Sequence, residues 1–573
     1  MKRIKLLFSK IKLTELIENK WFSYAIIFLF SFLILLPFLF GKFHLGDDGM
    51  YHMATIEAYS YDLPFSVFAK ILPQVGDNLG FGTGIFYPAL PHITGAIIFK
   101  FISLFGFGLI AMEHLLHLLI VLLSGITMFW FAQKVFKDNK KSLFCSLFYI
   151  TYNYLFVDIV MRDALNESFM FIFMPLVFLG LYYLFYEKNA QKFYLWFILG
   201  YLGLMYSHLV MTVYFTIFLI IVLLFYFKEV FNKNNFKHLF IASILILLLS
   251  STFTVLMIEH KIYGDYYVFD KFVWTKDNVW GMPFIGYFYP YYYATGFDGL
   301  IYANINCLVI IFLILTIYKL ITKKISKPRR KFIFAIGLFW ILGILLNSFT
   351  GLWLHIPNIL LSIQFLWRLS AFVGFGVAIF AAESLDLFFN CFKKSFIFVG
   401  MLVLMLPLGY FIYYNHTKVV YHESFWYEDR FSYGAVREYF PNSTFKNHRD
   451  YFYNRSDTEI NILSGRADVK LLNNVVPKMR FSVSNLKENA IIELPRLYYL
   501  GYEIVGPDGK KISYKEDKYG FVSLEITKNG IYRVNYIGTK AYQIAVVIKS
   551  LTILVILGYY IYYRKKRPKG VEM

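Results

Sequence analysis

Long apolar runs, separated by short basic connections, constrain this chain more than any other feature. At about 20 apolar residues per membrane span, the chain holds twelve runs, at 22–40, 109–133, 142–161, 168–186, 193–207, 208–227, 238–258, 299–318, 332–348, 369–387, 395–413 and 542–563. Only 16% of the residues are charged, against about a quarter in a soluble domain. We predict a polytopic α-helical membrane protein with about twelve transmembrane helices in a lipid bilayer.

The positions of lysine and arginine predict a direction for these helices. Alternate connections carry the basic residues, at 134–141, 188–192, 228–237, 319–331 and 393–394 and in the tail RKKRPK. Cytoplasmic loops are enriched in Lys and Arg, so we predict a multi-pass membrane protein with both termini in the cytoplasm. The same topology explains the net charge of +20 without a nucleic-acid partner. The apolar segment 90–108 would invert every later loop if it spanned, so we predict a helix in the outer interface.

The region before the last apolar run differs in kind. Residues 414–541 alternate apolar and polar positions, as in FVSLEITK and IYRVNYI, with turn signals such as Pro507-Asp508-Gly509. We predict three parts: a transmembrane domain at 1–413 with an outer loop at 41–108, an extracytoplasmic β-rich domain at 414–541, and a last helix with a basic tail at 542–573.

The first outer loop opens with an acidic segment, HLGDDGMYHMATIEA, which contains Asp47, Asp48, His52 and Glu57. Ionisable groups at a membrane edge are costly unless they are paired or face water, so each is a functional candidate. A carboxylate at an apolar boundary suits a general base that acts on an acceptor hydroxyl. The alternative is that Asp47 or Asp48 caps the helix that carries Glu57.

A second acidic and basic segment, VDIVMRDALNES, ends the third apolar run. Asp158 and Arg162 lie one helical turn apart, and so do Asp163 and Glu167. An arginine at headgroup depth can bind a phosphate through two parallel hydrogen bonds. The alternative is an ordinary interfacial ion pair.

The remaining candidates are predicted on the same side of the membrane, whereas the inner side shows no comparable gathering. They are His208, Gln364, Arg368, and the trio Glu113, His114 and His117. The trio could bind a divalent metal, but interfacial packing is the better explanation, so no metal site is assigned. The sequence has no P-loop, GxGxxG or HExxH motif, so we predict neither an ATP-driven nor a dinucleotide-dependent activity.

Several segments together resemble bacterial YfhO-type membrane proteins and the related family named after 6-pyruvoyl-tetrahydropterin synthase, within the GT-C superfamily of glycosyltransferases. DDGMYHMATIEA is similar to their D-x3-H-x4-E opening, and VDIVMRDALNE to their D-x3-R-x-A-L-x-E element. LGFGTGIFYPALPHITGAI, QFLWR, EYFP and ELPRLYYLGYEIVGPDGK resemble later signatures in the same order. The chain departs from the pattern at Leu366, where proline is usual, and at Thr55, where arginine is common.

The resemblance implies a glycosyltransferase that moves a sugar from a polyprenyl-phosphate donor to a cell-envelope glycopolymer, such as a teichoic acid, on the outer face. It implies Asp48, or otherwise Asp47, as the base. It also implies that the substrate-binding residues are His52, Glu57, Asp158, Arg162, Glu167, His208, Gln364 and Arg368.

Two other functions stay open. A transporter or flippase of lipid-linked sugars would have the same number of spans, but it predicts polar groups near the bilayer midplane. A non-catalytic scaffold for envelope assembly would keep its function without Asp48.

Overall fold

The computed structural model describes most of the chain, at residues 18–39, 46, 48–72, 74–271, 281–288, 294–296, 299–301, 307–355, 365–387, 437–447, 449–475 and 478–566. It divides into two compact units. The first unit comprises Met1–Met50, Ile98–Leu239 and Val273–Glu428, and the second comprises Tyr51–Ile97, Phe240–Phe272 and Asp429–Met573. Helices α4 (Gly49–Tyr61), α6 (Leu90–Ser103) and α15 (Lys233–Tyr263) contain three of the points where the chain passes between units.

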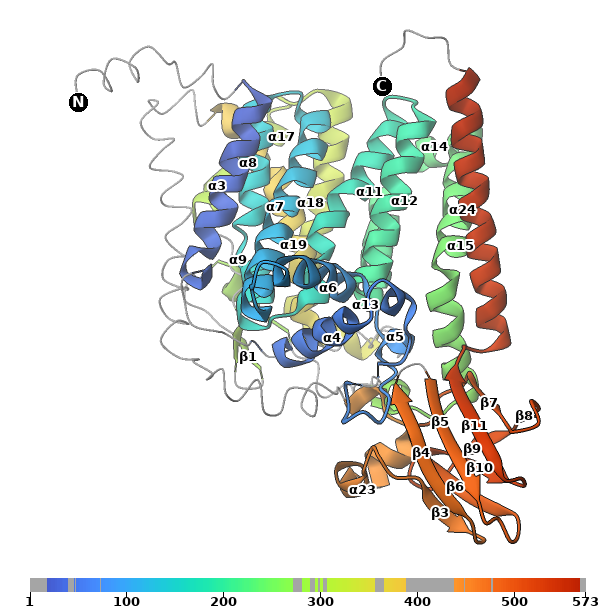
Figure 1. The fold of residues 1–573 in the computed structure, drawn as a ribbon. Coiled ribbons are helices and arrows are strands. Elements are labelled where there is room, and N and C mark those ends of the chain that lie inside the picture. Colours follow the sequence, from blue (N-terminus) through green and yellow to red (C-terminus); the bar gives the residue numbers. More distant parts are fainter. Residues whose placement is uncertain are drawn as a thin grey trace. The chain divides into compact units, whose positions relative to one another are not determined.

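The first unit is a helical bundle (Figure 1). Its helices are α3 (Lys20–Leu39), α7 (Leu109–Phe136), α8 (Asn139–Ile150), α9 (Asn153–Phe156), α10 (Leu165–Ser168), α11 (Met170–Phe185), α12 (Ala190–Ser207), α13 (Leu209–Leu224), α14 (Phe227–Val230), α17 (Cys307–Ile321), α18 (Lys327–Ser348) and α19 (Ser370–Ala382). Aromatic rings fill its centre, where Phe178 stacks on Phe375 at 4.8 Å. Gly180 lets α11 and α12 approach closely, because a Cβ there would lie 2.6 Å from the Phe197 nitrogen.

Five helices are long and apolar enough to cross a membrane. They are Leu109–Phe136, Leu165–Phe185, Lys233–Tyr263, Lys327–Ser348 and Lys540–Tyr562, with a sixth if the bent pair Asn139–Ile150 and Asn153–Val160 is one span. Shorter apolar helices occupy several other predicted runs. These helices confirm the prediction of an apolar, largely helical protein of membrane character, while the count of twelve spans stays a prediction.

Three of the predicted apolar segments need comment. The helix expected at 299–318 begins only at Cys307, because Gly299–Ile301 forms strand β2, paired with β1 (Ala294–Gly296). The apolar run there is interrupted in the sequence by Asn304 and Asn306. Helix α6 has 14 residues, about 21 Å at 1.5 Å per residue, which is too short for a hydrocarbon core of about 30 Å. The run 395–413 lies outside the described residues.

The second unit contains two antiparallel sheets, which confirm a β-rich region late in the chain. One sheet has the order β3-β6-β10-β9 and the other β4-β5-β11-β7-β8. The strands are β3 (Asn461–Ser464), β4 (Asp468–Val475), β5 (Lys478–Ser484), β6 (Ala490–Leu497), β7 (Tyr502–Val505), β8 (Lys511–Ile512), β9 (Tyr514–Glu516), β10 (Phe521–Ile526) and β11 (Gly530–Tyr536). Alternate side chains are buried, such as Met479, Phe481 and Val483 on β5, as the period of two predicts.

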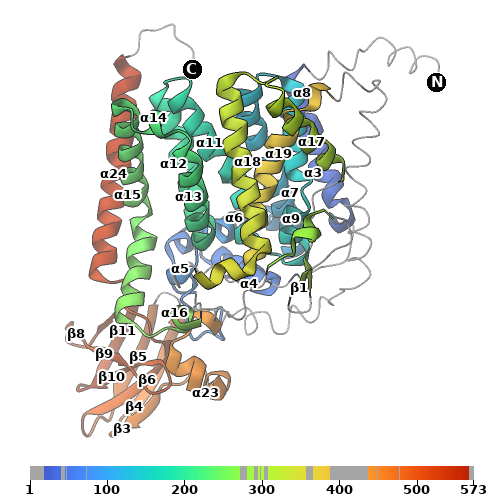
Figure 2. The same ribbon diagram turned by 180° about the vertical axis from the view of Figure 1, so that it is seen from behind.

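Parts of the segment 41–108, most of α15 and one further long helix belong to the same unit as the sheets. The Leu497 amide on β6 donates to the Leu79 carbonyl at 2.9 Å. Helix α24 (Lys540–Lys566) runs beside α15 in both views (Figures 1 and 2), and Ser251 donates to the Ala545 carbonyl at 3.3 Å. The boundaries 414 and 541 stay predictions.

Candidate functional site

An interruption in the helix after α8 positions the acidic and basic segment VDIVMRD. The chain bends by 46° between Asn139–Ile150 and Asn153–Val160 and then forms a π-helical turn, η2 (Val157–Met161). Asp163 follows with a φ of 49°, a left-handed conformation that costs a non-glycine residue energy. Irregular backbone of this kind is concentrated at functional sites.

The arginine cluster, defined as Tyr154, Asp158, Arg162, Glu167 and Arg368, is built on this interruption. Arg162 Nη1 donates to Asp158 Oδ1 at 2.6 Å and to Glu167 Oε2 at 2.9 Å. Tyr154 donates its hydroxyl to Glu167 Oε1 at 2.7 Å. Arg368 Nε, from the 3-10 turn Leu366–Leu369, lies 3.2 Å from Glu167 Oε2. All five side chains are buried, and two guanidinium groups balance two carboxylates.

The backbone just after α3 is attached directly to this cluster. The Asp48 amide donates to the Arg162 carbonyl at 2.8 Å. Only glycine fits at Gly46, since a Cβ there would lie 2.5 Å from the Asp163 nitrogen. The Asp48 side chain is exposed, and its carboxylate interacts electrostatically with Arg162. The structure thus brings Asp48, Asp158, Arg162, Glu167 and Arg368 together, whereas Asp47 and Gln364 lie outside the described residues.

His208 lies in the same unit, at the turn between α12 and α13. Its Nδ1 accepts from the Met211 amide at 3.3 Å, so the ring caps α13, and the side chain is buried. Asn166 donates to the Ser207 carbonyl at 2.7 Å and ties this turn to α10. The imidazole also interacts electrostatically with Glu167.

His52 and Glu57 lie in the second unit, on α4. His52 Nδ1 is 2.8 Å from His92 Nε2, the two rings stack, and both are buried. Glu57 is also buried and accepts from the Tyr61 hydroxyl at 2.9 Å. Sequence reasoning missed His92, and the available signal was a histidine inside the otherwise apolar FYPALPHITGAI.

A group with metal-binding geometry adjoins the arginine cluster in the first unit. Among the residues that the structure describes, Glu113, His117 and Asp163 place one ligand atom each within 4.8 Å of one another. His117 Nε2 is 3.3 Å from Asp163 Oδ1. The expected trio is therefore changed, because Asp163 takes part and His114 does not.

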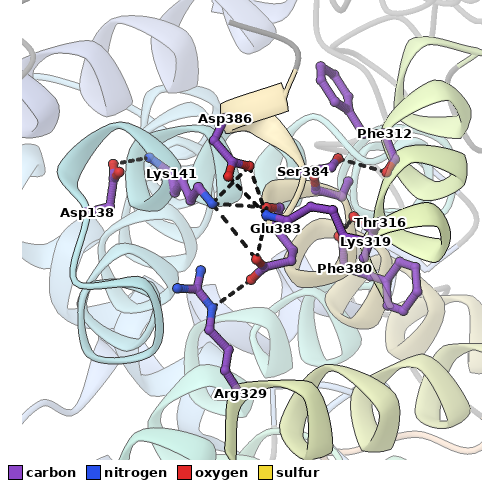
Figure 3. A network of polar contacts seen from close by, with 11 residues as sticks. Asp138, Lys141, Phe312, Thr316, Lys319, Arg329, Phe380, Glu383, Ser384 and Asp386 are labelled. Carbon is purple, nitrogen blue, oxygen red and sulfur yellow. Dashed lines mark hydrogen bonds and ion pairs between the residues drawn. The ribbon is translucent and has the colours of Figure 1, made fainter. Parts of the chain in front are cut away.

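A second ionic cluster, centred on the buried Glu383, lies at the ends of four helices (Figure 3), where no such gathering was expected. We call it the Glu383 cluster: Lys141, Lys319, Arg329, Glu383 and Asp386. Lys319 Nζ donates to Glu383 Oε1 at 2.9 Å, and Arg329 Nε lies 2.7 Å from Glu383 Oε2. Both Lys141 and Lys319 donate to the Glu383 carbonyl, at 3.0 and 2.8 Å. Spacing along the sequence did not reveal this gathering, because its members come from four different helices.

Comparisons with known proteins add little beyond this description. No family model matches the chain, and no curated protein matches it either. Among solved structures, it is similar to the Archaeoglobus fulgidus oligosaccharyltransferase tethered with an acceptor peptide, at a TM-score of 0.36 and 12% identity. The match covers 76% of this chain and 60% of that one, so the chain spans less than two thirds of that enzyme's length. The fold and the site define a largely helical protein of membrane character, with a late β-sheet domain and a buried arginine cluster.

Proposed function

We propose that this protein is a membrane glycosyltransferase of the GT-C type. It transfers a sugar from a polyprenyl-phosphate donor to a cell-envelope glycopolymer, such as a teichoic acid, on the outer face of the membrane. The proposal is carried by one observation: the amide of Asp48 is hydrogen-bonded to the carbonyl of Arg162. This bond attaches the backbone of an exposed aspartate to Arg162, whose buried guanidinium interacts electrostatically with the Asp48 carboxylate.

The arginine cluster suits the phosphate of the donor. Every hydrogen bond of the Arg162 side chain to a described residue uses Nη1. A guanidinium carries five N–H donors, and we propose that the other donors of Arg162 bind phosphate oxygens. Arg368 adds a second guanidinium that is held against Glu167 and over the Phe365 ring. The cluster as a whole carries no net charge. Its two arginines would still stabilise the negative charge that develops on the leaving phosphate, because their N–H donors are oriented in advance.

Asp48 would act as the general base. Its carboxylate accepts the proton of the acceptor hydroxyl while the acceptor oxygen bonds to the anomeric carbon. The bond from that carbon to the phosphate oxygen breaks, and polyprenyl phosphate leaves with the electron pair. A single displacement inverts the anomeric configuration. Asp47 is the alternative base, and His208 and Gln364 are candidates for substrate contact.

The second unit would contribute to acceptor binding. His52 and Glu57 follow Asp48 closely in the sequence, on α4, and are candidates for substrate contact. The two sheets, within residues 461–536, are our candidates for binding a polymeric acceptor. The proposal includes both termini in the cytoplasm, because the basic connections belong there.

A transfer assay with a matched pair of variants tests the proposal. The full chain in lipid nanodiscs receives a panel of radiolabelled polyprenyl-phosphate sugars and envelope glycopolymer, and transfer to polymer is counted. Asp48→Asn should lower the transfer rate by about 10²-fold or more, the usual contribution of a general base. Glu187→Gln, at an exposed position between α11 and α12, should transfer like the wild type.

Two outcomes would contradict the proposal. Unchanged transfer by Asp48→Asn would exclude this residue as the base, and Asp47→Asn measured in parallel then tests the alternative. No transfer by the wild type from any donor in the panel would favour the transporter or the scaffold.

A further inference from the structure

Three side chains outside the arginine cluster converge near the start of α7. Glu113 and His117 are four residues apart on this helix and therefore share a face. Asp163 reaches them from the segment after η2, and its Oδ1 lies 3.3 Å from His117 Nε2. The three groups offer two oxygen ligands and one nitrogen ligand within 4.8 Å of one another.

The two carboxyl groups of this trio face each other away from solvent. Glu113 and Asp163 are 4% exposed each, and their side chains interact directly. Two like charges at this depth need a cation or a shared proton between them. His117 Nε2 is a hydrogen-bond partner of Asp163 Oδ1. Asp163 Oδ2 has no hydrogen-bond partner among the described residues.

The backbone holds Asp163 in this position at a cost. Its φ of 49° is left-handed, and the Gly46 backbone packs against its amide. A strained residue that holds a buried carboxylate beside a histidine and a second carboxylate, with one of its two oxygens lacking a donor, is expected where a ligand offsets the cost.

We propose that Glu113, His117 and Asp163 bind a divalent transition-metal ion of the Mn²⁺ to Zn²⁺ class. The imidazole ligand favours these ions over Mg²⁺ and Ca²⁺, which prefer oxygen alone. Ligand atoms at about 2.1 Å from one ion are at most about 4.2 Å apart, so a shift of less than about 1 Å closes the site. Three protein ligands leave coordination positions open, as in metal sites that also bind substrate. Metal binding here does not depend on the proposed glycosyl transfer.

A metal titration of the full chain tests this site. Protein in lipid nanodiscs is stripped with a chelator and titrated with Mn²⁺ alone, and free Mn²⁺ is followed by electron paramagnetic resonance. The wild type should bind one ion per chain, and Zn²⁺ should displace it. Glu113→Gln and Asp163→Asn should each weaken Mn²⁺ binding at least tenfold. His114→Gln, a neighbouring histidine outside the trio, should leave the affinity unchanged.

A thiol substitution keeps the test informative if the carboxylate variants fold poorly. His117→Cys should raise the affinity for Cd²⁺ at least tenfold over the wild type, since a thiolate prefers soft ions, and His114→Cys should not. The proposal is overturned if the wild type shows no saturable Mn²⁺ binding. It is also overturned if folded variants bind like the wild type, or if the two cysteine variants bind Cd²⁺ equally.

Discussion

The arginine cluster and the Glu383 cluster are built from the same chemistry on different backbones. Each holds at least one buried carboxylate against cationic side chains in the helical bundle of the first unit. The Glu383 cluster uses the ends of ordinary helices, where two lysines also donate to a carbonyl at the end of α19. The arginine cluster uses a bent helix, a π-helical turn and the left-handed Asp163 next to it.

This difference separates a structural role from a functional one. Lysines that donate to the last carbonyls of a helix satisfy groups that the helix leaves without partners, so the Glu383 cluster holds four helix ends together. The arginine cluster is built on irregular backbone, which costs conformational energy. It also binds the backbone of the loop that carries Asp48. We therefore expect substitutions in the arginine cluster to change activity and those in the Glu383 cluster to change stability alone.

Replacing the central arginine should have the largest effect. Arg162→Ala leaves Asp158 and Glu167 buried without their guanidinium, which should cost about 3–5 kcal/mol of stability and abolish transfer. Arg329→Ala is the matched control, because Glu383 keeps Lys319 and lies near Lys141. Denaturant titration together with the transfer assay checks both. Equal losses of stability and activity in the two variants would break the comparison.

Replacing Glu383 should affect stability without affecting catalysis. Glu383→Gln removes the charge shared by Lys319 and Arg329, and breaking a buried pair of this kind costs about 3 kcal/mol. The rate of transfer per folded molecule should stay within about twofold of the wild type, since the site is untouched. A selective loss of turnover in folded Glu383→Gln would assign this cluster to the reaction.

A buried carboxylate in the β-sheet domain extends this comparison to an ion pair outside the predicted membrane spans. Glu493 on β6 accepts from Arg455 at 2.7 Å, but burial, followed by a hydrogen bond with Asp517, raises its pKa from 4.5 to about 7. A raised pKa means that the protonated form is favoured by folding. This contribution is complete below about pH 4.5 and is lost as the pH rises through about 7.

Hydrogen exchange on β6 and β10 measures this dependence. Protection should fall between pH 5 and 8 after correction for intrinsic exchange, and Glu493→Gln should flatten the profile. A wild-type profile as flat as that of the variant would refute the assignment.

The smallest expected effect concerns the strained residue. Asp163→Ala should cost about 1 kcal/mol more than Asp163→Asn in metal-free protein, because asparagine tolerates the left-handed region and alanine does not. Thermal unfolding in the presence of a chelator compares the two. If alanine is the more stable of the two, the conformation of Asp163 is not strained.

Spacing along the chain predicted only part of this structure. The apolar runs predicted the helices, the alternation predicted the late sheets, and the four-residue spacing predicted the Asp158–Arg162 pair. The spacing could not reveal His92 beside His52, or Asp163 beside His117, because these partners are 40 and 46 residues apart. Glu383 appeared isolated for the same reason, since its cationic partners come from three other helices.

Labelling with a photoreactive polyprenyl phosphate tests the central claim most directly, because it reports binding of the donor phosphate at the arginine cluster. The account predicts saturable labelling of wild type and of Glu383→Gln, and at least tenfold weaker labelling of Arg162→Lys, which keeps the charge but loses the bidentate fork. Equal labelling of folded Arg162→Lys and Glu383→Gln would contradict it.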